Sequence, residues 1–226
     1  MRPIAAGTRL AISREMIHII ANNNYHRRYT MTLLAKRCLA ALVLTASSQA
    51  AFAELPGMQG PQHLGFTVPD RQAAVDFFVD VIGCEAYFTI GPFGPFEDDW
   101  MSVNLNVHPE ATIPAAHLVR CGDGTNLEIF EYTSPDQRTE QPRNSDIGGH
   151  HIAFYVDDMN EAVAYLKENE VKVLGEPHPF TEGPMEGLTW VYFMAPWGMQ
   201  LELVSVPYGS MGYEKENRGR LWDPRH

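Results

Sequence analysis

The chain has 226 residues, of which 45% are hydrophobic and 20% charged, and its formal net charge at pH 7 is −11. This is the composition of an ordinary globular protein, and it predicts one compact domain or two small modules. So acidic a chain is a poor match for nucleic acid or an anionic membrane, whose phosphates attract basic residues. A small molecule is therefore the expected partner.

Residues 1–53 are predicted to be an N-terminal extension and a cleavable signal peptide. From Met31, the expected start, the chain reads MTLLAKRCLAALVLTASSQAAFA: two basic residues, a short apolar run and a small-residue ending. This order is typical of secretory signals, although a core helix or a twin-arginine signal at Arg27-Arg28 are alternatives. We expect cleavage before Glu54, a periplasmic or secreted protein, and no membrane association after cleavage.

An internal repeat organises the remainder of the chain. QHLGFTVPDRQAAVDFF, from Gln62, aligns with HHIAFYVDDMNEAVAYL, from His150. GTNLEIFEY, from Gly124, aligns with GMQLELVSV, from Gly198. The two segments lie farther apart in the first copy, so this copy contains an insertion, which we place within residues 91–112.

Each copy is predicted to fold as βαβββ, which makes the protein α+β. In the first copy we expect a strand at 63–68, a helix at 70–82 and strands near 85–90, 115–120 and 126–132. In the second we expect a strand at 151–156, a helix at 158–169 capped by Asp158, loops within 175–187, and strands at 188–193 and 199–206. The predicted organisation is a first module at 61–133, a linker at 134–147, a second module at 148–206 and a tail at 207–226.

Strand alternation selects which histidine of the His150-His151 pair faces a shared site. Leu64, Phe66 and Val68 must pack on the helix, so His63 lies on the opposite face of its strand. The repeat places His151 on the equivalent face and turns His150 elsewhere. By the same argument Glu128 and Glu202 lie on the open faces of their strands.

These four residues, His63, Glu128, His151 and Glu202, are the predicted metal ligands. A single strand histidine is more often a core residue, and a single strand glutamate can be a solvated edge. Two imidazoles and two carboxylates at equivalent positions suit one divalent ion, Ni, Zn, Co, Mn or Fe, in a six-coordinate site. The four converge if the copies pack around a pseudo-twofold axis.

The segments QHLGFTV, NLEIFEY, GHHIAFYVDD and PWGMQLELV resemble the vicinal oxygen chelate superfamily over about residues 61–206. The resemblance implies a cup-like, curved mixed sheet whose concave face holds the metal and a substrate with adjacent oxygens. The set of two histidines and two glutamates is most similar to that of glyoxalase I. This implies lyase or isomerase chemistry, in which Glu202 moves a proton beside a carbonyl and Glu128 is its counterpart.

Two alternatives remain open at this point. An Fe(II) extradiol-type dioxygenase is similar in fold, but its site has no glutamate at the position of Glu128. A non-catalytic exported protein that binds a metal or a small molecule is the other. Whether the site forms within one chain or between the subunits of a homodimer is also left open.

Glutathione is a poor expected substrate, because the chain is predicted to be exported and has few basic residues to hold an acidic tripeptide. The candidates for binding a substrate carboxylate are Arg71, Arg120, Arg138 and Arg143, with solvated surface arginines as the alternative. An apolar substrate wall is expected from loop residues Phe93, Phe96, Trp100, Phe180, Met185 and Trp190. His108, His117 and His178 have no partner in the other copy and receive no role.

Two cysteines remain once Cys38 leaves with the signal peptide. With no Cys-x-x-Cys spacing, a thiolate metal site is not expected. Cys84 begins the strand after the first helix and Cys121 ends an antiparallel strand, so the two could form a disulfide. Free buried cysteines are the alternative.

Overall fold

The computed structural model describes residues 55–215 and 221–224. The predicted extension and signal peptide lie outside these residues. A compact unit begins at Gln59. None of the helices within the described ranges has the length and apolar character needed to cross a membrane.

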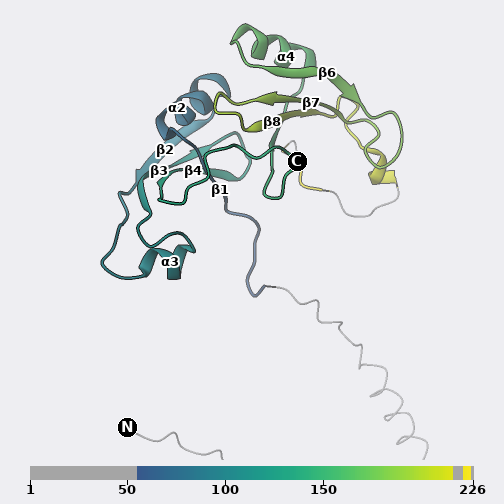
Figure 1. Ribbon diagram of the computed structural model, residues 1–226. Helices are drawn as coiled ribbons and strands as arrows, with labels where there is room; N and C mark the ends of the chain where they lie inside the picture. Colours follow the sequence, from purple (N-terminus) through teal and green to yellow (C-terminus); the bar gives the residue numbers. More distant parts are fainter. Residues whose placement is uncertain (1–54, 216–220, 225–226) are drawn as a thin grey trace, which may run out of the picture. The chain divides into compact units, whose positions relative to one another are not determined.

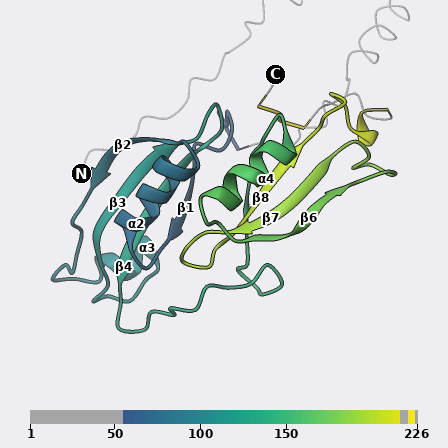
Figure 2. The same ribbon diagram turned by 90° about the horizontal axis from the view of Figure 1, so that it is seen from above.

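The first module is a four-stranded sheet covered on one face by a helix (Figure 1, Figure 2). The sheet has the order β1-β4-β3-β2, with β1 parallel to β4 and the other pairs antiparallel. Its elements are β1 (His63–Thr67), α2 (Arg71–Asp76) with its π-helical continuation η2 (Phe77–Val81), β2 (Glu85–Ile90), α3 (Trp100–Leu105), β3 (Thr112–Arg120) and β4 (Asn126–Thr133).

The second module repeats this topology, with the order β5-β8-β7-β6 and β5 parallel to β8. The predicted repeat and the α+β fold class are thereby confirmed. The elements are β5 (Ile152–Tyr155), α4 (Met159–Glu168), β6 (Val173–Pro179), β7 (Thr189–Met194) and β8 (Gln200–Ser205), and a short 3-10 helix η3 (Gly212–Lys215) follows in the tail.

Both repeat helices begin at an aspartate in the same position of the copy. The Asp70 side chain accepts a hydrogen bond from the Ala73 amide at the start of α2. Asp158 accepts bonds from the amides of Asn160 and Glu161, as predicted. Each aspartate satisfies amides that have no partner within the first helical turn.

The two modules share one hydrophobic core. Phe78 of η2 is fully buried, and its ring lies 6.5 Å from that of Phe154 in β5 and 5.8 Å from that of Trp197. The Tyr165 hydroxyl of α4 donates a hydrogen bond to the Val81 carbonyl at the end of η2. The helix sides of the two sheets therefore pack together within one chain.

The segment predicted as loop at 175–187 in fact contains most of β6. Glycines and prolines together predict a loop here, and proline in particular cannot donate a ladder hydrogen bond. β6 lies at the edge of its sheet and pairs with β7 alone, with an irregular register between Leu174 and His178. An edge position tolerates proline, so the sequence pattern was misleading here.

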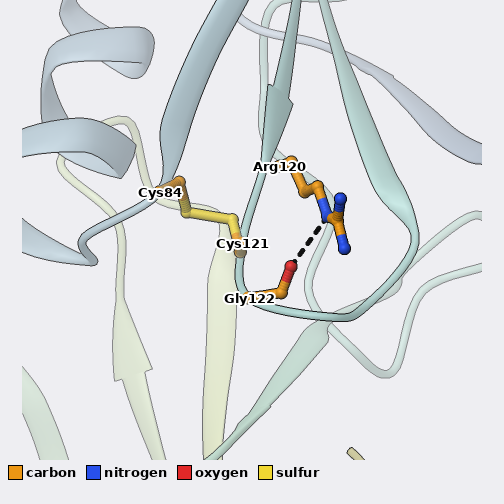
Figure 3. The surroundings of a disulfide bond; sticks show 4 residues. All are labelled: Cys84, Arg120, Cys121 and Gly122. Carbon is orange, nitrogen blue, oxygen red and sulfur yellow. Dashed lines mark hydrogen bonds between the residues drawn. A yellow bond between two sulfur atoms is a disulfide. The ribbon is translucent and has the colours of Figure 1, made fainter.

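Cys84 and Cys121 form a disulfide, with their Cα atoms 4.2 Å apart (Figure 3). The bond joins the residue before β2 to the residue after β3. Beside it, the Arg120 Nε donates to the Gly122 carbonyl in the turn between β3 and β4. The structure thus selects the disulfide from the two alternatives that the sequence left open.

We expect the Cys84→Ala/Cys121→Ala double variant to unfold more easily than the oxidised wild type. The bond closes a sequence separation of 37 residues, and restricting a loop of that size in the unfolded chain stabilises the fold by about 4 kcal/mol. Denaturant unfolding measures the difference. With dithiothreitol present, the difference should shrink to the effect of packing alone; an unchanged difference would show that the disulfide is not its source.

Candidate functional site

His63 and Glu128 form a pair across the parallel strands β1 and β4. Gly65 lies opposite Glu128 in the register, so His63 reaches the carboxylate diagonally from two residues earlier in β1. The His63 Nε2 lies 3.2 Å from the Glu128 Oε2, and the Nδ1 bonds to the Gln62 side-chain oxygen. The histidine side chain is 44% exposed and the carboxylate 15%.

His151 and Glu202 form the equivalent pair across β5 and β8. Ala153 lies opposite Glu202, and the His151 Nε2 lies 3.1 Å from the Glu202 Oε2. His150 takes no part, because its Nδ1 bonds to the Gly148 carbonyl. Strand alternation therefore selected the histidine that contacts the Glu202 carboxylate.

Burial and charge shift the acidity of the groups around these pairs. Burial raises the pKa of the Glu202 carboxyl, while His151 beside it acts in the opposite direction. Burial raises the pKa of the Tyr192 phenol, and the nearby Glu202 carboxylate adds to this effect. Burial and then Glu128 raise the pKa of Tyr132 in the same way. A carboxyl with a raised pKa is better suited to accept a proton near neutral pH.

The four predicted ligands gather as two pairs and not as one set of four. Across the part of the chain that the structure describes, no group of three or more His, Cys, Asp or Glu side chains is placed to hold a metal ion. Metal sites in proteins take at least three protein ligands as a rule. Each module by itself therefore supplies half of the predicted site.

The donor chemistry of each pair fits a divalent ion. Two neighbouring ligands with metal bonds of about 2.1 Å at a right angle lie about 3 Å apart, close to the spacing found in both pairs. When the neutral His63 ring donates from Nδ1 to Gln62, its Nε2 presents a lone pair toward the carboxylate. Two lone pairs facing each other favour a cation or a proton between them.

A cavity of about 800 Å³ lies over the His63–Glu128 pair. Its outer walls come from the segment after α3 and the segment after β4, which contribute Asn106, His108, Asp136, Gln137 and Arg138. Except for Arg138, sequence reasoning gave none of these residues a role. For Asn106 and His108 the sequence repeat gave no indication of a role, because both lie in the insertion that has no counterpart in the second copy.

Gly65 keeps the floor of this cavity open. A Cβ at this position would lie 3.2 Å from a ring carbon of Phe130 and 3.7 Å from the Glu128 Oε2. A larger side chain would therefore occupy the space directly beside the carboxylate. The absence of a side chain lets a ligand approach the pair closely.

Aromatic rings flank the second pair. The Tyr192 ring lies 5.2 Å from the His151 ring, Trp190 lies 5.0 Å from Tyr192, and Phe180 stacks on Trp190 at 6.3 Å. Of the six residues expected to form an apolar substrate wall, Phe180 and Trp190 lie in this cluster. Met185 instead lines a separate cavity of about 820 Å³ on the helix side.

Only one of the four candidate arginines lies near a predicted ligand. Arg120 pairs with Asp123 and Arg143 with Asp146, both at the surface. Arg71 lies near His117, at 3.5 Å, on the helix face of the first sheet. Arg138 lines the cavity over His63 and Glu128.

The comparisons with known proteins identify the family. A sequence profile described as the glyoxalase/bleomycin resistance protein/dioxygenase superfamily matches residues 62–193. The chain belongs to this superfamily. The resemblance predicted from the repeated segments is therefore confirmed.

The relatives of the chain include an enzyme. A 2-epi-5-epi-valiolone epimerase from Actinomyces sp is 46% identical over 171 residues, which cover 75% of this chain and 91% of that protein. YaeR from Escherichia coli is 24% identical and covers 65% of this chain and 96% of that protein. A glyoxalase family protein from Bacillus cereus, solved by crystallography, shares the fold, with 17% identity, a TM-score of 0.52, and coverage of 69% and 97%.

His117, which received no role from the sequence, should make the stability of the fold depend on pH. Burial, and then the charge of Arg71, lower its pKa below the ordinary value of 6.5. The folded protein thus binds a proton at His117 less readily than the unfolded chain does. The contribution of His117 to the free energy of unfolding is therefore largest above pH 6.5, and it is lost as the pH falls below that value.

The melting temperature between pH 7.5 and 5 measures this effect. On acidification the melting temperature of the His117→Gln variant should fall by fewer degrees than that of the wild type. His150→Gln, which removes an exposed histidine, is the control and should behave as the wild type. Equal slopes for all three proteins would show that His117 does not contribute.

Proposed function

We propose that the protein is a metal-dependent epimerase that transfers a proton at a carbon next to a carbonyl of its substrate. The observation that carries this proposal is the pair of His–Glu sites in a chain that is 46% identical to a 2-epi-5-epi-valiolone epimerase. The ending of that substrate's name denotes a ketone, whose neighbouring C–H bonds are the acidic ones. The same compound is therefore the first substrate to test.

The proposed residues have distinct roles. His63, Glu128, His151 and Glu202 would hold the divalent ion, which when bound polarises the carbonyl and acidifies the adjacent C–H. The Glu202 carboxylate, whose pKa is raised by burial, accepts the proton from that carbon. Glu128 returns a proton to the opposite face, so the configuration inverts. One C–H bond breaks and one forms, and no oxidant or reductant is needed.

The other reactions expected from the sequence have less support. A lyase of the glyoxalase I type is not favoured, because the 46% identical relative is an epimerase. An Fe(II) extradiol-type dioxygenase does not account for the second glutamate, Glu128, which pairs with its histidine as Glu202 does. The hypothesis of a non-catalytic binding protein does not explain why the chain is 46% identical to an epimerase.

We propose further that two copies of the chain complete each site. The histidine of each pair lies at the edge of its sheet: His63 is on β1, and His151 directly precedes β5. Placing β1 of one copy beside β5 of another brings a His63–Glu128 pair next to a His151–Glu202 pair. Apolar residues on these strands, Leu64, Ile152 and Phe154, line the open helix-side cavity and favour burial against a partner.

Export remains part of this proposal, to the periplasm or out of the cell. The Cys84–Cys121 disulfide supports it, because disulfides persist in oxidising compartments and are rare in reducing ones.

The reaction is tested with 2-epi-5-epi-valiolone in deuterium oxide. Wild type reconstituted with a divalent metal should form an epimer that carries deuterium at the inverted carbon, as read by NMR. Glu202→Gln retains an oxygen that can contact the metal but is no base, so turnover should fall by a factor of about 10² or more. Elemental analysis should find the metal in both proteins. Inversion without deuterium, or full activity of the variant, would contradict the mechanism.

Sharing of the site between copies predicts complementation. His63→Ala and His151→Ala should each be inactive as pure proteins. If the two are unfolded and refolded together, half of the dimers are mixed, and each mixed dimer has one intact site. About a quarter of wild-type activity should return, whereas a site within one chain would give none. Mixing His63→Ala with Glu128→Gln is the control, because both changes affect the same pair and neither combination restores a site.

A further inference from the structure

We infer that the site selects a neutral, polyhydroxylated ring. Its hydroxyl groups form hydrogen bonds with four side chains, those of Asn106, His108, Gln137 and Arg138. This inference rests on the proposed function and adds the substrate class and the residues that recognise it. None of these residues belongs to the His–Glu pairs. All four line the cavity over His63 and Glu128.

The four side chains keep hydrogen-bonding capacity free toward a ligand. His108 accepts the Glu110 amide at Nδ1, so its neutral ring carries the proton on Nε2 as a donor. Gln137 donates to the Tyr132 carbonyl and retains its side-chain oxygen as an acceptor. Within the described part of the chain, the side chains of Asn106 and Arg138 make no hydrogen bond or ion pair.

This mixture of donors and acceptors suits hydroxyl groups. A hydroxyl both donates and accepts, so a wall that offers both kinds of group can satisfy several hydroxyls at once. A wall of donors alone would suit a phosphate or a carboxylate better. Groups left unpaired in a site also reject a ligand that lacks the matching hydroxyl.

The charge of the cavity argues against an anionic substrate. In the completed site the two carboxylates Glu128 and Glu202 offset the charge of a divalent ion. Of the other ionised residues in the cavity, Arg138 carries a positive charge and Asp136 a negative one. No net positive charge remains to bind a phosphate or an acidic peptide.

The second half-site offers a surface for the face of a ring. Trp190 and Tyr192 are only half-buried, and Phe180, whose ring stacks on Trp190, is 39% exposed. A cyclic polyol has polar edges, formed by its hydroxyls, and less polar faces, formed by its C–H bonds. A polar wall from one copy and an aromatic wall from the other match these two features.

Binding of myo-inositol, a neutral cyclic polyol without a carbonyl, tests the inference independently of turnover. Saturation-transfer NMR on the metal-loaded protein should detect myo-inositol, and inositol monophosphate should bind no more tightly. Three variants should weaken binding: Asn106→Gly, which preserves the left-handed backbone at φ 54, Arg138→Gln and Phe180→Ala. Arg143→Gln and His150→Gln, on the surface of the same chain, are the matched controls and should bind as the wild type.

The KM for 2-epi-5-epi-valiolone provides the second readout. Loss of one hydrogen bond to a hydroxyl should raise KM about fivefold in Asn106→Gly and in Arg138→Gln, with kcat and metal content less affected. Wild-type KM and unchanged inositol binding in these variants would overturn the inference, even if epimerisation is found. Tighter binding of the phosphate would overturn it too. Inositol binding that the variants weaken, without epimerisation, would preserve the substrate class and reject the reaction.

Discussion

The contact between an imidazole and a carboxylate across two parallel strands is the feature on which the rest of the site depends. It occurs twice, between β1 and β4 and between β5 and β8, with nearly equal distances. In each pair a small residue, Gly65 or Ala153, lies opposite the glutamate in the strand register. The histidine lies two residues before this small residue. The parallel register fixes this diagonal relation, and the helix on the other face fixes which side chains point outward. A divalent ion is the partner that we propose for this geometry.

The position of these strands in their sheets explains why one chain presents the pairs separately. β1 and β5 are both edge strands, and the module helices pack into a common core on the other side. A shared core uses the apolar faces of the sheets and leaves the faces with the pairs open. The symmetry of the repeat makes each pair a suitable complement for the other in a second copy.

The two halves have the same scaffold but different surroundings. The insertion in the first copy forms α3 and the segment after it, which adds Asn106 and His108 to a polar wall. The second copy has no such insertion, and its pair is flanked by the rings of Tyr192 and Trp190. Duplication thus accounts for the repeated His–Glu pairs of the two halves, and in our proposal the different loops recognise the substrate.

The sequence by itself determined the repeat, the α+β class, the Asp158 cap of the second helix and the strand face on which His151 lies, because strand and helix periodicities are local. It missed β6, since an edge strand tolerates the prolines that normally indicate a loop. Only the tertiary structure decided that Cys84 and Cys121 are bonded and that the four predicted ligands form two pairs. The tertiary structure also decided that Arg138, of the four candidate arginines, lines the cavity over His63 and Glu128. Distances between segments far apart in the chain depend on how the modules pack, and no local pattern encodes them.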